Sequence, residues 1–141
     1  MASHICYKNV LIGDELPSLV KHPTPRQLVQ WAGATGEFCE MHYNDAYAKE
    51  KGFPGIIVHG MLTASFLCQM VIDWMGEEGS IKNLSISNRS MLFPDNDIIC
   101  RGLVEDKYET DDECFVKCNV WAENPQGEKA VIGSVIVVVP A

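Results

Sequence analysis

The most informative pattern along the chain is a run over 60–75 in which almost every position is apolar. Its polar residues Ser65, Gln69 and Asp73 stand four apart, so on a helix they form one narrow stripe. A helix that is apolar nearly all round is typical of a buried one. We therefore expect a long helix over about 60–75 that lies in the core and ends at Gly76, since glycine favours the position after a helix.

The first third of the chain gives weaker signals. An apolar stretch over 5–12 is compatible with a strand. Thr24 followed by Pro25 predicts the start of a helix, because threonine caps free N–H groups and proline suits the first helical position. That helix should end near Gly33 or Gly36, where glycine favours termination.

A long segment without a regular period follows, over 36–57, with a short helix expected within 44–50. Structured loops of this length in compact domains are more often functional than idle. We therefore expect functional residues within 36–57.

From residue 80 onward, apolar and polar residues alternate as they do in strands. We expect strands around 84–86, 98–104, 114–122 and 131–139, separated by turns at 94–97, 111–113 and 124–127. Several strands joined by tight turns, with one buried helix, predict an α+β fold with an antiparallel sheet. The 141 residues fit one domain, 1–141.

Charge and cysteine content limit the classes of partner and the compartment that we expect for this protein. A formal charge of −8 argues against nucleic acid or an anionic membrane as a partner, and it means that an anionic ligand needs local basic groups or backbone amides. The six cysteines form no C-x-x-C pair, and the first residues lack the apolar core of a signal peptide. These features favour a cytoplasmic protein with reduced thiols and no metal site.

Two features carry candidate chemistry. Glu37 and His42 stand five apart in the irregular segment, and a carboxylate and an imidazole can hold a water and move its protons. His59 and Gly60 open the long helix, whose first N–H groups have no partner within the helix. Gly60 would let a ligand oxygen approach those groups. Taken separately, each also fits an ordinary loop pair or helix start.

Together the two features resemble a known family. The segment ATGEFCEMHYNDAYA, 34–48, is similar to the signature of MaoC-like proteins, which include the (R)-specific enoyl-CoA hydratases, and Thr35, Gly36, His42 and Ala48 match it in register. The passage GFPGIIVHGMLTASFL, 52–67, is similar to the strand-to-helix passage of that family. The resemblance extends over essentially the whole chain, and is strongest to single-domain small subunits of acyl-thioester dehydratases.

The resemblance implies a hotdog fold, in which an antiparallel sheet wraps around a long central helix. It also implies hydration of trans-2-enoyl-CoA to 3-hydroxyacyl-CoA, or the reverse, without metal or redox cofactor. Glu37 and His42 would handle water and protons, and the Gly60 amide would donate to the thioester oxygen. The family's aspartate is Glu37 here, its asparagine is Cys39 and its proline is Glu40, so the acid is kept with one extra C–C bond.

Further candidates for substrate contact are Cys39, at the asparagine position, and Ser65, although a serine bonding to its own helix backbone fits Ser65 as well. We interpret His59 as a structural residue and Trp31 as part of the core or an interface. The resemblance also implies a homodimer or higher homo-oligomer, or a heteromer with a second hotdog subunit. A non-catalytic or half-catalytic partner subunit and a hotdog acyl-CoA thioesterase remain as alternative functions.

Overall fold

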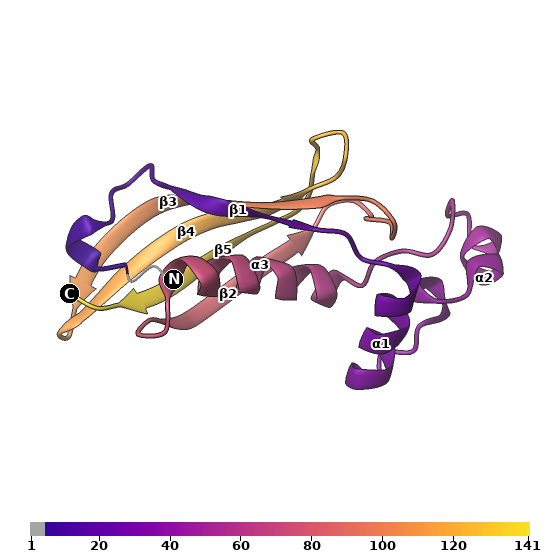
Figure 1. Ribbon diagram of the computed structural model, residues 1–141, viewed down its shortest axis with the longest axis horizontal. Helices are drawn as coiled ribbons and strands as arrows, with labels where there is room; N and C mark the ends of the chain where they lie inside the picture. Colours follow the sequence, from indigo (N-terminus) through magenta and orange to yellow (C-terminus); the bar gives the residue numbers. More distant parts are fainter. Residues whose placement is uncertain (1–4) are drawn as a thin grey trace.

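The computed structural model describes residues 5–141 and shows one curved sheet with a long helix lying in its hollow (Figure 1). The five strands are antiparallel in the order β1-β3-β4-β5-β2. In chain order, the elements are η1 Tyr7–Asn9, β1 Glu15–Lys21, α1 Pro25–Thr35, η2 Glu40–His42, α2 Asp45–Glu50, α3 Gly60–Met75, β2 Ser80–Asn88, β3 Ile98–Thr110, β4 Glu113–Glu123 and β5 Lys129–Val139. The expected α+β class and antiparallel sheet are confirmed.

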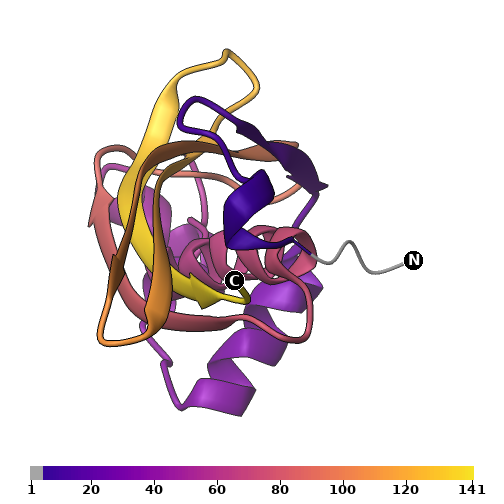
Figure 2. The same cartoon turned by 90° about the vertical axis from the view of Figure 1, so that its left-hand side faces the viewer.

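The core lies between α3 and the concave face of the sheet. Seen from one end, the strands curl around the helix (Figure 2). Inward-facing residues alternate along the inner strands, as in Val116, Cys118 and Val120 of β4, each at most 1% exposed. They meet Leu67 and Met70 of α3, which are equally buried. Burying this apolar surface is the main force that holds the helix in place.

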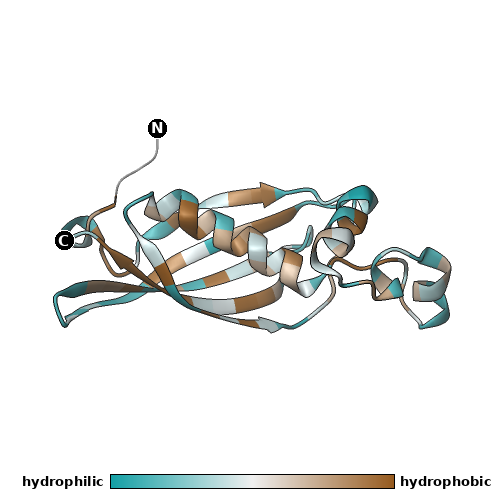
Figure 3. Ribbon diagram, turned by 90° about the horizontal axis from the view of Figure 1, so that it is seen from below, coloured by the Kyte–Doolittle hydropathy of each residue, from teal (hydrophilic) through white to brown (hydrophobic). Residues whose placement is uncertain are grey.

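The helix α3 has the expected bounds, but it is less buried than its composition predicts. Nine of its residues are buried, while Met61 and Ile72 are 69% and 50% exposed. These two lie on the open face that also carries Gln69 and Asp73, and Figure 3 shows apolar and polar residues following one another along the helix. One curved sheet covers only one side of a helix, so apolar residues on the other side remain exposed.

The first strand is a correction to the sequence-based prediction. Residues 5–12 hold a short 3-10 helix instead of a strand, and the strand begins at Glu15. The register of β1 against β3 shifts between Leu16 and Leu19, which hides the alternation. Pro17 falls in this irregular part, and β1 is an edge strand, where proline is tolerated.

The helices α1 and α2 project beyond one end of the sheet (Figure 1). Thr24 accepts a hydrogen bond from the Gln27 N–H, and Gly36 ends α1 in the left-handed conformation at φ 78°, as the capping signals predict. Asn44 caps α2 in the same way through the Tyr47 N–H. Among residues 5–141, no helix is both long and apolar enough to cross a membrane.

Candidate active site

His42 sits at the end of η2, and its ring is fixed by the segment that leads into α3. Nδ1 lies 2.8 Å from the backbone carbonyl oxygen of Ile57, while the Ile57 N–H donates to the Met41 carbonyl at 3.0 Å. A carbonyl oxygen only accepts, so Nδ1 carries the proton and donates it. In the neutral ring Nε2 therefore keeps its lone pair, as a general base requires.

Glu37 follows the C-terminal cap of α1. The Gly36 N–H donates to the Ala32 carbonyl at 2.9 Å, and the left-handed turn then redirects the chain toward η2. Glu37 Oε1 accepts from the Cys39 N–H at 3.1 Å. The carboxylate is thereby turned back along its own loop, on the exposed side of the site.

The start of α3 supplies the third component. The His59 carbonyl accepts from the Leu62 and Thr63 N–H groups, at 3.1 and 3.2 Å, so the Gly60 and Met61 N–H groups precede the first of these bonds. The His59 side chain makes no capping hydrogen bond. Free N–H groups and the helix dipole make such an end favourable for a partly negative oxygen.

One cavity brings these components together. It has a volume of about 340 Å³ and is lined by Trp31, Thr35, Glu37, His42, His59, Gly60 and Met61. A second hollow of about 160 Å³ shares His42 and Gly60 with it, and its other lining residues include Ile57, Val58, Leu92 and Val131. The structure thus unites Glu37, His42 and Gly60, with a second compartment next to the last two whose lining includes both apolar residues and the polar Thr63, Asn88 and Ser90.

The two weaker candidates lie outside the lining of this cavity. The Ser65 hydroxyl donates to the Met61 carbonyl of its own helix at 3.0 Å, which matches the alternative interpretation of this residue. Cys39 contributes its backbone N–H, which binds the Glu37 carboxylate. Its role here comes from the main-chain N–H, which every residue type except proline supplies.

Two further residues line these hollows. Trp31 packs against the core, as the sequence predicts, and it also lines the cavity. Asn88, at the end of β2, lines the second hollow and lies against Gly60. No local signal marks Asn88, because only the folding of the sheet brings the end of β2 to the start of α3.

His59 is the buried member of the site. It is 2% exposed, and among residues 5–141 neither ring nitrogen has a hydrogen-bond partner. Burial lowers the pKa of His59, and the nearby His42 lowers it further. The backbone carbonyl of Glu37 and its carboxylate act in the opposite direction, but the carbonyl does not reach hydrogen-bond geometry. The net lowering of the pKa favours the neutral form of His59.

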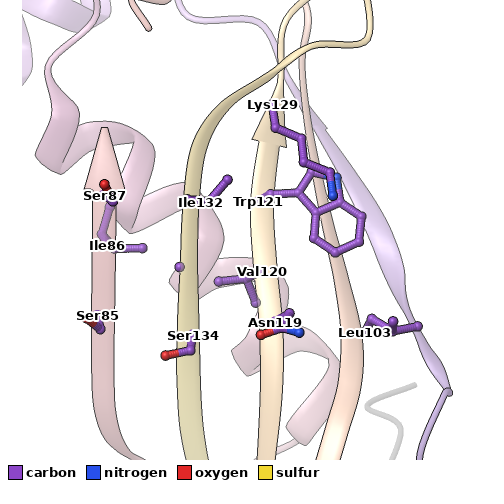
Figure 4. A pocket seen from close by; sticks show the side chains of 11 residues that line it. Ser85, Ile86, Ser87, Leu103, Asn119, Val120, Trp121, Lys129, Ile132 and Ser134 are labelled. Atoms are coloured by element: carbon purple, nitrogen blue, oxygen red, sulfur yellow. The ribbon is translucent and has the colours of Figure 1, made fainter. Parts of the chain in front are cut away.

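A larger hollow of about 530 Å³ lies on the sheet face turned away from α3 (Figure 4). Its walls include Leu103, Trp121 and Ile132, and within the described part of the chain Lys129 is the only ionisable residue that lines it. The Lys129 ammonium stands 4.2 Å from the Trp121 ring. A lone lysine held over a tryptophan gives no acid–base pair, so the smaller cavity beside α3 is the candidate for chemistry.

Comparison with known proteins identifies the family of this chain. A family described as MaoC like domain matches residues 9–124. That span contains all of Glu37, His42 and Gly60. No curated protein matches the chain by sequence.

Solved structures share the fold over nearly the whole chain. An (R)-hydratase from A. caviae involved in PHA biosynthesis has a TM-score of 0.86 at 22% identity, covering 94% of this chain and 99% of that one. The R-hydratase PhaJ1 from Pseudomonas aeruginosa has a TM-score of 0.87 at 20% identity, covering 97% and 86%. The ChsH1-ChsH2 complex from Mycobacterium tuberculosis has a TM-score of 0.82 at 22% identity, covering 92% of this chain and 98% of that one. These likenesses confirm the hotdog fold.

Proposed function

This chain belongs to the MaoC-like domain family, and from that premise and its site geometry we propose that it hydrates an enoyl thioester or dehydrates a 3-hydroxyacyl thioester. The observation that carries the proposal is the single cavity shared by Glu37, His42 and the opening of α3 at Gly60. A base, an acid and an oxyanion donor around one cavity are what addition of water to a conjugated thioester needs.

In the hydration direction, the oxygen of water forms a bond to the β-carbon of a trans-2-enoyl thioester, and His42 Nε2 accepts one water proton. The electron pair of the double bond moves toward the thioester oxygen, where the Gly60 N–H and the α3 dipole stabilise it. The pair returns to the α-carbon, which takes one proton from the Glu37–His42 pair. Water thus adds as OH and H, and the site regains its protons.

The two compartments suggest an orientation for the substrate. The acyl chain would occupy the smaller hollow, where Val58, Leu92 and Val131 offer apolar contacts. The reacting carbons would then lie beside His42 and Gly60, which line both hollows. The carrier, CoA or an acyl-carrier protein, would extend from the open cavity mouth near Met61, which is 69% exposed.

A role as partner subunit is the second candidate. Val29, Phe38 and Met61 are each more than half exposed on α1, the Glu37 loop and the start of α3, which surround or adjoin the site. Large exposed apolar side chains often mark protein contacts. We propose that a second hotdog subunit covers them, either another copy of this chain or a different one.

The decisive test uses crotonyl-CoA and longer enoyl-CoAs with the purified chain, alone and with any hotdog protein encoded beside it. Loss of enoyl absorbance without release of free thiol supports a hydratase. Release of free thiol identifies a thioesterase instead. A non-catalytic partner is identified if the chain alone has no activity, the mixture is active, and the His42→Ala variant of this chain leaves the activity of the mixture unchanged.

The matched control is His22→Ala. His22 is exposed and pairs with Asp97 at 2.9 Å, outside the cavity. We expect His42→Ala to lower kcat on the order of 100-fold or more, the usual size of a general acid–base contribution, while His22→Ala retains it. Equal activity of both variants would show that the site is assigned wrongly.

A further inference from the structure

The ring of His59 lies directly against the ring of His42. Their centroids are 3.8 Å apart and their planes differ by 22°, which is a stacked arrangement. The Trp31 ring lies 6.4 Å from His59 at a tilt of 54°. His59 therefore touches or neighbours side chains from α1 and η2 while it forms the N-terminal cap of α3.

The ring nitrogens of His59 do not explain its place. Both are buried and lack a partner among residues 5–141, and an unpaired buried polar group costs free energy. An apolar residue would avoid this cost. The contact that His59 does make is through the flat face of its ring, which stacks on His42.

We propose that His59 is a positioning residue, whose ring is the platform that holds the His42 imidazole with Nδ1 on the Ile57 carbonyl and Nε2 available to water. The inference rests on the proposed function for its catalytic consequence, but the geometry that it describes can be measured without any substrate. It adds a residue to the site that contacts the base and not the reacting atoms.

Two rings in van der Waals contact restrict each other in a way that one hydrogen bond does not. The Nδ1 bond to Ile57 fixes one point of the His42 ring and leaves rotation about that bond open. The stacked His59 ring limits this rotation. Without it Nε2 would sample several directions, and misplacement by about 1 Å costs on the order of 100-fold in rate.

Two variants separate stacking from chemistry at the His59 nitrogens. His59→Phe keeps a neutral flat ring and removes both nitrogens, whereas His59→Leu removes the ring. We expect His59→Phe to lose less than about tenfold in kcat, and His59→Leu to lose on the order of 100-fold with KM nearly unchanged. Equal losses in the two variants would overturn the proposal, because the nitrogens would then carry the effect.

The substrate-free measurement is a long-range ¹H–¹⁵N spectrum of the full chain with ¹⁵N-labelled histidine. The four histidines are few enough to assign by single substitutions; His4 lies outside the described residues. We expect His42 to be a single Nδ1–H tautomer in the wild type and in His59→Phe, and a mixture in His59→Leu. An Nε2–H tautomer in the wild type would contradict the proposal even if His59→Leu does not fold.

The spectrum also distinguishes a failure of the proposed hydratase function from a failure of the positioning role of His59. If no form of the protein hydrates any enoyl thioester but the His42 tautomer still depends on the ring at position 59, the proposed function fails and the positioning role stands. If hydration is found and the His42 tautomer is the same in folded His59→Leu as in the wild type, the positioning role fails alone.

Discussion

The side-chain amide of Asn88 covers the Cα of Gly60. A Cβ built on Gly60 would lie 2.9 Å from Asn88 Nδ2, closer than real Cβ contacts come, and 3.1 Å from Oδ1, which is tighter than most of them. Gly60 does not have a positive φ, so its backbone does not require glycine. A side chain at position 60 would instead have to displace the end of the Asn88 side chain beside the first turn of α3.

We therefore expect Gly60→Ala to push Asn88 aside and to obstruct the approach of a thioester oxygen to the helix end. Hydration should fall on the order of 100-fold, the usual cost of losing one oxyanion donor, and steady-state kinetics on an enoyl-CoA would measure it. Gly33→Ala is the control, since it has open space in α1 and should add about 0.5–1 kcal/mol of stability without affecting rate. Wild-type activity in Gly60→Ala would exclude this helix end as the oxyanion site.

The length of the Glu37 side chain gives a second prediction. Glu37→Gln keeps the shape and loses the acid, so kcat should fall on the order of 100-fold. Glu37→Asp keeps the acid, and an aspartate can also accept a hydrogen bond from the N–H two residues on, so more than a tenth of the activity should remain. Glu50→Gln, at the exposed end of α2, is the charge-matched control. Similar rates for Gln and Asp at position 37 would argue against proton transfer by this residue.

The lowered pKa of His59 predicts how stability depends on pH. Burial is the main cause, the stacked His42 adds to it, and Glu37 opposes both. Because the unfolded chain takes up a proton at about pH 6.5 and the folded chain only at lower pH, this contribution to stability is complete above pH 6.5. It is lost as the pH falls from 6.5 to the lowered pKa.

Urea unfolding of the wild type and His59→Phe at pH 7.5 and pH 5 would test this. The phenylalanine cannot take up a proton, so the variant should lose less stability between the two pH values than the wild type. A greater loss in the variant would mean that His59 is protonated in the folded protein.

Two of the six thiols should be inert in the native protein. Cys100 and Cys118 face the core with no measurable exposure, and burial raises the pKa of each thiol to about 12. Only the thiolate reacts with alkylating reagents, so at pH 8 both should stay unlabelled while the partly exposed Cys6, Cys39 and Cys114 react. Mass spectrometry of native and urea-unfolded protein would locate the labels. Rapid labelling of Cys118 in the folded state would contradict the packing of β4 against α3.

The elements that the sequence predicts well are those with local causes. Thr24 and Gly36 bound α1 because a cap and a left-handed turn act within one helical turn. The helix α3 follows from its own apolar run, and β4 from alternation that one face of a buried sheet requires. The family signature likewise identified Glu37, His42 and Gly60 as candidates, because motif residues are neighbours along the chain.

Tertiary structure alone decided the relationships between distant segments. The first strand is Glu15–Lys21 and not the predicted 5–12, because pairing with β3 decides which residues form a strand. The tertiary structure also left one side of α3 open, brought Asn88 over Gly60 and stacked His59 on His42. The sequence therefore determined the helix caps, the strand pattern and the candidate groups, which depend on near neighbours. The placing of those groups against each other was decided by burial and side-chain contact across the fold, which no local pattern encodes.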